Sequence, residues 1–338
     1  MKKSTTLSFA ALLITIGGLN FNSCKQQPKF SGTIVPVDIN EIGAPIQKYI
    51  YGQFIEHLGR CIYGGIWAEM LMDRKFYYPV TDDYVPWDMA SEKFWADESL
   101  LKYPYLAKSP WQIEGPAGNL YMDIRDPYVG EHTPVIRVNG EKAGIRQNEL
   151  SVLAGRNYVG RVVLAGERAL LPVSIQLSTP EGQTETITIE NLTSGFQTYQ
   201  FEMAPGFTSD STSLEIFSEG VGNLRIGTVS LMPADNIQGW RRDVVGLLRE
   251  LNAPVYRWPG GNFVSGYNWR DGIGERDKRP PRKNPAWKGI EHNDVGIHEY
   301  MELMELIDAE PFIAVNTGLG TVEEVAEEIQ YCNGSVHS

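Results

Sequence analysis

Cysteine is scarce in this chain of 338 residues, which contains only three. One of them, Cys24, lies in an N-terminal leader, so Cys61 and Cys332 alone remain for the folded part. Two cysteines in a chain of this length do not make the disulfide framework of a small secreted domain. Because an unpaired cysteine packs as a small hydrophobic residue, we expect both to be buried free thiols.

Basic residues are also few. The chain has 30 Lys and Arg against 42 Asp and Glu, which gives a net charge of −12. A nucleic-acid partner is therefore not expected, because binding to phosphates requires a basic surface. Apolar residues make up 42%, as in an ordinary soluble protein, and the length allows about two domains. The 8 Trp, 16 Tyr and 12 Phe suit stacking on sugars, although a large core uses the same residues.

No hydrophobic run is long enough to cross a membrane. The apolar run at 7–18 follows a basic start and has the length of a signal peptide's hydrophobic region. Ser23 and Cys24 then resemble a bacterial lipoprotein processing site, at which Cys24 would receive the lipid. Ordinary cleavage without modification is the alternative. We take residues 1–24 as the signal peptide and expect export to the periplasm or cell surface, with membrane contact only through the lipid anchor.

The rest of the chain falls into three zones. Residues 30–110 begin with strand-like runs at 32–39 and 49–55, followed by a short helical patch at 65–72 and an aromatic loop region. Residues 111–233 contain seven short runs of alternating polarity between turn signals, which is typical of an all-β sandwich. The predicted sandwich at 111–233 is thus inserted between residues 30–110 and residues 234–338.

Residues 234–338 have helical and strand patterns in turn. Apolar residues recur at helical spacing over 240–251 and 297–307, and apolar strands follow at 254–258 and 311–316. A third helix opens at Thr321, with Glu324 in the position of a capping box. Alternation of this kind predicts an α/β domain with a parallel sheet.

Polar side chains gather where two of these strands end. Glu56 follows the strand at 49–55, and Arg257 and Asn262 accompany the strand at 254–258, with Gly260 and Gly261 allowing a tight turn. In parallel α/β barrels the carboxyl ends of the strands face the ligand, so these three side chains are candidate ligand contacts. A structural ion pair between Glu56 and Arg257 is an equally weighted alternative.

Two other groups of charged residues give weaker indications of a functional site. The loop at 266–287 is rich in basic residues but has no glycine-rich phosphate cradle, so we expect a solvated loop with one or two aromatic sugar contacts. A metal site would need ligands such as those of the zinc proteases, whose His-Glu-x-x-His pattern is absent. We therefore expect no cofactor, and we interpret four acidic and histidine residues as polar surface residues of a barrel helix: His292, Asp294, His298 and Glu302.

Five ordered motifs resemble the α-L-arabinofuranosidases of glycoside hydrolase family 51. They are FIEHLGR (54–60), YGGIW (63–67), RWPGGNF (257–263), YNWRDGIG (267–274) and EPFIAVN (310–316). The resemblance implies a TIM (β/α)8 barrel, a carbohydrate-binding-like sandwich at 111–233, and metal-free retaining removal of terminal arabinofuranosyl groups from an arabinose-containing oligo- or polysaccharide. It also implies site residues: Glu56 and Asn262 on the arabinose hydroxyls, Trp287 lining the site, and Arg257 at the barrel mouth.

The chain departs from this family in its number of strands. Only about three of eight barrel strands can be counted, and no Asn-Glu motif at the end of a fourth strand is present. Retaining hydrolysis needs two carboxyl groups on either side of one bond. We therefore expect an N-terminal portion of such an enzyme, with the acid/base and nucleophile Glu beyond residue 338. The alternative is a non-catalytic sugar-binding lipoprotein. Because similar barrels also cleave β-linked glucans, arabinose is inferred from the motifs alone.

Overall fold

The computed structural model describes residues 38–93, 100–284 and 286–335. The chain divides into two units, Met1–Ile46 and Gln47–Ser338. The described part of the first unit, 38–46, is fully exposed and carries no helix or strand. The predicted signal peptide and Cys24 lie outside the described residues. No helix among the described residues is long and apolar enough to cross a membrane.

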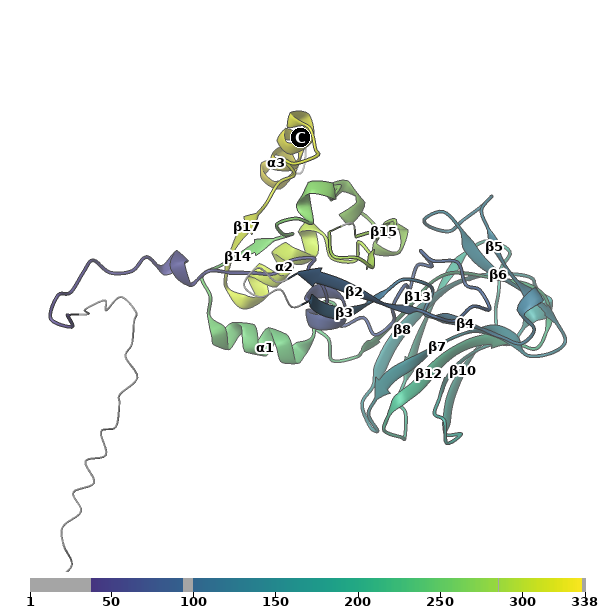
Figure 1. Cartoon of the computed structure of the whole chain (residues 1–338). Coiled ribbons are helices and arrows are strands. Elements are labelled where there is room, and N and C mark those ends of the chain that lie inside the picture. Colours follow the sequence, from purple (N-terminus) through teal and green to yellow (C-terminus); the bar gives the residue numbers. More distant parts are fainter. Residues whose placement is uncertain (1–37, 94–99, 285, 336–338) are drawn as a thin grey trace, which may run out of the picture. The chain divides into compact units, whose positions relative to one another are not determined.

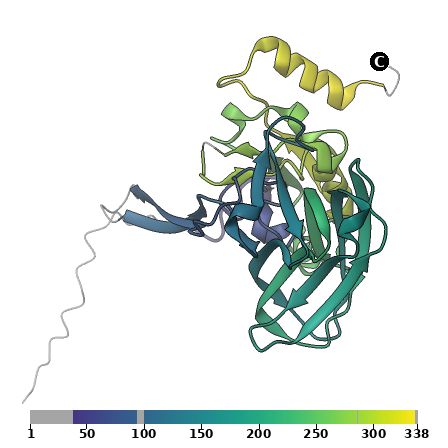
Figure 2. The same cartoon turned by 90° about the vertical axis from the view of Figure 1, so that its right-hand side faces the viewer.

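Two five-stranded antiparallel sheets form the predicted β-sandwich (Figures 1 and 2). One sheet has the order β10-β9-β12-β7-β4 and the other has the order β11-β8-β13-β6-β5. The strands are β4 (Trp111–Glu114), β5 (Leu120–Asp123), β6 (Thr133–Asn139), β7 (Ala143–Val152), β8 (Tyr158–Ala165), β9 (Val173–Ser178), β10 (Thr184–Ile189), β11 (Gln197–Met203), β12 (Ser209–Ser218) and β13 (Val221–Pro233).

Alternation of polarity along each strand builds the sandwich core. In β9, Val173, Ile175 and Leu177 are fully buried, whereas the residues between them are partly exposed. Because side chains of a strand point alternately to its two faces, this pattern places one face of the sheet against the core. Gly160 of β8 is required where the strands pack closely, since a Cβ there would lie 2.1 Å from the ring of Phe201.

A three-stranded parallel sheet forms the α/β part, in the order β1 (Gln53–Phe54), β14 (Val255–Trp258) and β17 (Glu310–Ile313). The helices are α1 (Arg242–Leu251), α2 (Ile297–Ile307) and α3 (Val322–Asn333). On α2, Tyr300 stacks on Trp258, with 5.3 Å between ring centroids, and its hydroxyl donates to the carbonyl of Tyr256. The capping box at the start of α3 forms as predicted.

The segment between β1 and the sandwich differs from its prediction. Instead of a helix at 65–72, a wide helical turn spans Ile62–Ile66, with Gly64 at φ +76°, and the chain then runs irregularly. Trp67 fixes this path, because its ring packs edge-on against Trp240 at 5.0 Å. The predicted loop contains a hairpin of β2 (Trp87–Lys93) and β3 (Leu100–Leu106).

The remaining elements are short. A small antiparallel pair consists of β15 (Arg282–Lys283) and β16 (Ile290–Glu291). Single 3-10 turns occur at Lys48–Tyr51, Ala117–Asn119, Arg168–Leu170, Val264–Gly266, Trp269–Gly272 and Arg276–Lys278. Both cysteines are free thiols, as expected, but the prediction that they are buried is wrong: Cys61 is half-buried, and Cys332 is exposed near the end of α3.

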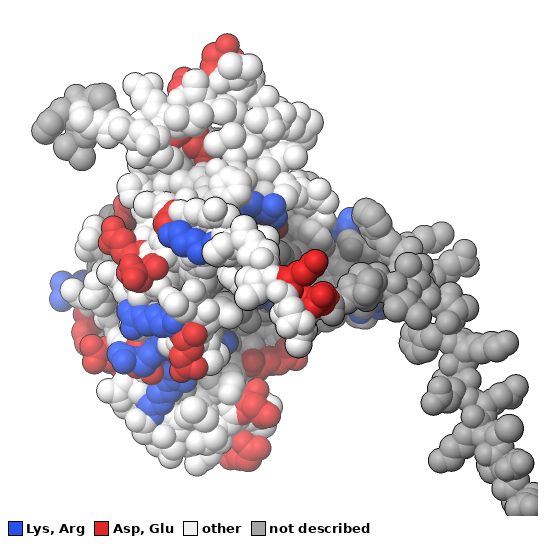
Figure 3. Space-filling view, turned by 90° about the vertical axis from the view of Figure 1, so that its left-hand side faces the viewer, with Lys and Arg blue, Asp and Glu red and all other residues white. Residues whose placement is uncertain are grey.

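Acidic and basic side chains are interspersed on the face shown in Figure 3. Exposed ion pairs in the described part of the chain include Arg241 with Asp243 at 2.6 Å. Exposed pairs of this kind contribute little to stability, because water screens them and the side chains lose freedom.

Candidate functional site

Parallel pairing brings the ends of β1 and β14 to the same edge of the sheet. The ladder continues past the strands, with Ile55 N donating to Arg257 O and His57 N donating to Pro259 O, both at 2.9 Å. Glu56 lies between these two paired residues, so its position follows from the backbone. We call this edge, with the residues that follow the three strands, the strand-end site.

Glu56 and Arg257 form an ion pair at the strand-end site. The Glu56 side chain is only 7% exposed, and its Oε1 accepts from both Nε and Nη2 of Arg257, the former at 3.0 Å. Its Oε2 accepts from the backbone N–H of Gly261 at 3.2 Å. The structural ion pair considered from the sequence is therefore present. It also holds the carboxylate in one orientation at the edge where a ligand would meet it.

Gly260 makes this close approach possible. Its φ is +143°, a conformation that other residues rarely adopt, and a Cβ there would lie 3.1 Å from Glu56 Oε2. The turn leaves Asn262 exposed, directly after Gly261, whose N–H bonds to Glu56. Three of the four predicted binding residues therefore gather within one short stretch of the strand-end site.

Trp287, the fourth predicted residue, lines a neighbouring cavity. The cavity has a volume of about 400 Å³ and shares His57, the residue after Glu56, with the strand-end site. The amide of Asn284 donates to the carbonyl of His57 at 3.1 Å, and its oxygen accepts from Trp287 N at 3.0 Å. Asn284 thus ties the Trp287 loop to the end of β1.

The buried imidazole of His57 is a further residue of this site that the sequence patterns did not indicate. Its Nδ1 lies 2.5 Å from Oε2 of Glu291, and its ring stacks on Phe263 at 4.6 Å. The other carboxylate oxygen of Glu291 accepts from the Tyr63 hydroxyl at 2.5 Å. In the sequence, His57 directly follows Glu56 within the motif FIEHLGR (54–60), and this position could have indicated it.

Two of the residues assigned to a helix surface are in fact buried. His292 and Asp294 precede α2, and Asp294 accepts from Arg74 Nε at 2.6 Å and lies 2.8 Å from Lys75 Nζ. Because Arg74 and Lys75 come from a segment more than 200 residues away, local spacing could not reveal this burial. These two cations lower the pKa of Asp294, while burial lowers the pKa of His292 to about 4.

His298 and Glu302 are exposed on α2, as expected. His298 Nε2 lies 2.7 Å from the hydroxyl of Tyr331 on α3. Among the described residues, no group of three His, Cys, Asp or Glu side chains is arranged to hold a metal ion.

The loop at 266–287 is solvated only in part. Trp269, Asp277 and Arg279 are buried, because the loop supplies charged partners to other elements. Arg279 donates to Glu299 of α2 at 2.9 Å, and Asp277 accepts from Arg74 at 2.8 Å. Several of its basic residues therefore stabilise the fold rather than bind an anion.

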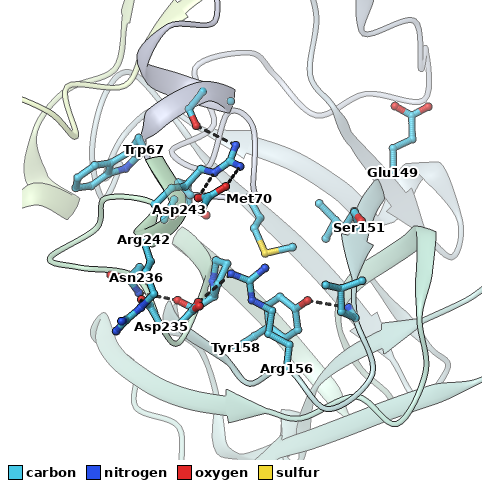
Figure 4. A pocket seen from close by; sticks show the side chains of 18 residues that line it. Trp67, Met70, Glu149, Ser151, Arg156, Tyr158, Asp235, Asn236, Arg242 and Asp243 are labelled. Carbon is cyan, nitrogen blue, oxygen red and sulfur yellow. Dashed lines mark hydrogen bonds and ion pairs between the residues drawn. The ribbon is translucent and has the colours of Figure 1, made fainter. Parts of the chain in front are cut away.

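A larger cavity of about 590 Å³ lies between the sandwich and the start of α1 (Figure 4). Four of its charged side chains form ion pairs with one another: Arg156 pairs with Asp235 at 2.9 Å, and Arg241 pairs with Asp243. Its aromatic residues, Trp67 and Tyr158, are each only 1% exposed and so offer no ring face to a ligand. The strand-end site and its adjoining cavity are therefore the better candidate.

Comparison with known proteins gives consistent results. Residues 247–338 match the family described as "Alpha-L-arabinofuranosidase 1 domain". The probable α-L-arabinofuranosidase C of Aspergillus clavatus is 46% identical over 103 residues, 30% of this chain and 20% of that protein. The intracellular exo-α-L-arabinofuranosidase of Bacteroides ovatus is 46% identical over 111 residues, 32% of this chain and 21% of that protein. The aligned part of this chain thus spans about a fifth of these relatives' length.

A solved structure shares the fold over most of the chain. It is an arabinose-bound α-L-arabinofuranosidase of glycoside hydrolase family 51, with a TM-score of 0.65 and 20% identity over 83% of this chain and 48% of that one. The combination of an α/β part with a β-sandwich is therefore shared with that protein.

Proposed function

We propose that this chain belongs to a glycoside hydrolase that removes terminal α-L-arabinofuranosyl groups, because residues 247–338 match the α-L-arabinofuranosidase 1 domain. The substrate would be an arabinose-containing oligo- or polysaccharide. The observation that carries this proposal is the family match, which contains Arg257, Asn262 and Trp287. Glu56 lies outside the matched segment, but its hydrogen bond with Arg257 links it to that segment and so supports the proposal.

Each predicted binding residue has a role in this proposal. The Glu56 carboxylate accepts hydrogen bonds from sugar hydroxyls, and Arg257 keeps it oriented. The exposed amide of Asn262 can both donate to and accept from hydroxyls. Trp287 lines the site with an apolar ring.

We propose further that the three parallel strands are part of a TIM barrel. Parallel strands joined by helices support this view, as does the likeness in fold to the arabinose-bound enzyme. In such barrels the active site lies at the carboxyl ends of the strands, where Glu56 and Asn262 are.

Catalysis needs more than the strand-end site contains. A retaining mechanism uses two carboxyl groups about 5–5.5 Å apart, one as acid/base and one as nucleophile. Among the residues directly after the three described strands, Glu56 carries the single carboxylate, so a second one is missing. Our proposal therefore assigns the two catalytic Glu to barrel strands beyond residue 338. The same observation favours the second candidate function, a non-catalytic sugar-binding lipoprotein.

Export also belongs to this proposal. The basic start, the apolar run at 7–18 and the Ser23–Cys24 pair support a lipoprotein signal peptide with lipid on Cys24. Incorporation of radiolabelled palmitate into the wild-type chain but not into Cys24→Ser, when both are produced in a bacterium, tests this part separately.

Titration of the chain with methyl α-L-arabinofuranoside in a calorimeter tests sugar binding. We expect Glu56→Gln to weaken binding by about 10- to 100-fold, because a hydrogen bond to a charged group contributes roughly 1.5–3 kcal/mol. Glu219→Gln, an exposed turn position between β12 and β13, is the matched control and should bind like the wild type.

An arabinose-release assay on an aryl α-L-arabinofuranoside tests whether this chain is catalytically active by itself. Binding without turnover fits either a sugar-binding protein or an enzyme whose catalytic carboxylates are absent from this chain. Turnover by the purified chain would contradict our assignment of both catalytic Glu beyond residue 338. Absence of binding would contradict the arabinofuranosyl specificity.

A further inference from the structure

Five aromatic side chains line the 400 Å³ cavity beside Glu56. They come from three separate segments: the turn after β1, the β2–β3 hairpin and the loop before β16. The aromatic residues are Tyr63, Trp87, Tyr103, Tyr105 and Trp287. The volume lies in the lower part of the range of about 300–1,000 Å³ found for small-molecule sites.

The hairpin, which Figure 1 labels β2 and β3, supplies one wall. Its register pairs Trp87 with Leu106 and Asp88 with Tyr105, and the Tyr105 hydroxyl donates to the Asp88 carboxylate at 3.2 Å. The guanidinium of Arg60 lies 5.1 Å from the centroid of the Trp87 ring. A cation over an aromatic ring is attracted to the face of that ring, so Arg60, in the turn after β1, holds Trp87 at the cavity wall.

Two buried imidazoles complete the lining. His57 and His292 are 4% and 7% exposed. His57 Nε2 and His292 Nδ1 have no hydrogen-bond partner within the part of the chain that the structure describes. A buried polar atom without a partner is costly, and a hydroxyl-bearing ligand would satisfy it. Because burial lowers the pKa of His292 to about 4, this ring is neutral near pH 7 and can accept a hydrogen bond.

We propose that this cavity is the subsite for the sugar ring to which the arabinofuranosyl group is attached, with Trp87 as the residue that gives preference for an oligosaccharide over a simple arabinoside. This inference rests on the proposed function, which places the arabinofuranosyl group at the neighbouring Glu56. Aromatic rings cover the apolar face of a sugar, while the two imidazoles bind its hydroxyls.

Space beyond the cavity fits a longer ligand. A second cavity of about 290 Å³ shares Arg60, Tyr63 and Trp87 with the first and extends to β7 of the sandwich at Asn148. Trp87 therefore lies where two cavities meet. An oligosaccharide that enters from the strand-end site can continue past Trp87 toward the sandwich.

Calorimetry on the full chain with two ligands tests this subsite. One ligand is methyl α-L-arabinofuranoside, and the other is an arabinofuranosyl-substituted oligosaccharide of three or more sugars. We expect the oligosaccharide to bind at least about fivefold more tightly, which is the scale of one aromatic contact. Trp87→Ala should remove this gain without changing the affinity for the monosaccharide, and Trp87→Phe should restore most of it.

Tyr121→Ala is the matched control. Tyr121 is an exposed aromatic residue on β5, with the guanidinium of Arg137 4.8 Å from its ring centroid, and it lines neither of these two cavities. It should leave both affinities unchanged. Retained far-ultraviolet circular dichroism and the Trp87→Phe variant show that any loss in Trp87→Ala is not a folding defect.

The outcomes separate the subsite from the proposed function. If the monosaccharide binds but the oligosaccharide gains nothing, or if Trp87→Ala keeps the gain, the subsite is wrong and the arabinofuranosyl site stands. If the monosaccharide fails to bind while the oligosaccharide binds through Trp87, the subsite stands and the arabinofuranosyl specificity fails. If neither ligand binds, both are contradicted.

Discussion

Individual buried ionisable residues have opposite effects on the pH dependence of stability. Burial lowers the pKa of His292 to about 4, so folding favours its neutral form, and this contribution is lost as pH falls from about 6.5 to 4. Burial raises the pKa of Asp73 to about 7, although its carboxylate accepts from the N–H groups of Tyr77 and Tyr78. The protonated form of Asp73 is therefore favoured on folding, and its contribution is lost as pH rises from about 4 to 7.

Replacing His292 isolates one of these effects. The shift from 6.5 to about 4 corresponds to about 3 kcal/mol. Between pH 7 and pH 4, His292→Gln should therefore lose about 3 kcal/mol less of its free energy of unfolding than the wild type does. Urea titrations at a series of pH values measure this difference. His298→Gln, an exposed position on α2, is the control, and equal pH slopes for His292→Gln and the wild type would contradict the prediction.

At the scale of the element, the parallel sheet has two unlike faces. On one face Tyr256 and Trp258 are buried beneath α2. On the other, the register places Phe54, Arg257 and Phe312 side by side, and the two phenylalanines are 53% and 55% exposed. Parallel sheets are ordinarily covered on both faces, so this apolar face favours contact with another polypeptide surface.

We predict that the exposed face causes self-association of the chain. Phe312→Ser should weaken association by about tenfold or more, because burial of a phenylalanine contributes roughly 1.5–3 kcal/mol. Val221→Ser, an equally exposed position on β13 of the sandwich, should have little effect. Sedimentation velocity over a range of concentrations measures both. A wild-type chain that stays monomeric throughout would show that this face does not associate.

At the scale of the whole molecule, buried ion pairs join the sandwich to the α/β part. Asp277 of the long loop accepts from Arg161 on β8 at 2.7 Å and from Arg74 at 2.8 Å, and Arg74 also donates to Asp294. The paired arginines lower the pKa of Asp277. Removing one member of such a group leaves buried charge without compensation, which costs about 3–5 kcal/mol.

Asp277→Asn should therefore destabilise the protein by about 3 kcal/mol and make the unfolding of the sandwich and of the α/β part less cooperative. Tryptophan fluorescence and far-ultraviolet circular dichroism, followed together during urea unfolding, should give coincident transitions for the wild type and separated ones for the variant. Asp235→Asn changes an exposed pair with Arg156 and should cost less than about 1 kcal/mol. Coincident transitions in Asp277→Asn would show that other contacts join the two parts.

Periodicity in the sequence determined the β-sandwich and the helices after residue 240, because which side of a helix or strand a residue faces is a local property of the backbone. The alternation of these helices with apolar strands indicated the parallel sheet. The motifs around Glu56 and Arg257 likewise indicated the family. Tertiary structure decided which residues are buried and which residues line the same cavity, because the spacing of residues in the sequence does not show this. Arg74 and Lys75 bury Asp294 from more than 200 residues away, and the hairpin brings Trp87 into the same cavity as Trp287. Burial of a charge and the shape of a cavity depend on which distant segments meet, and that is settled only when the whole chain packs.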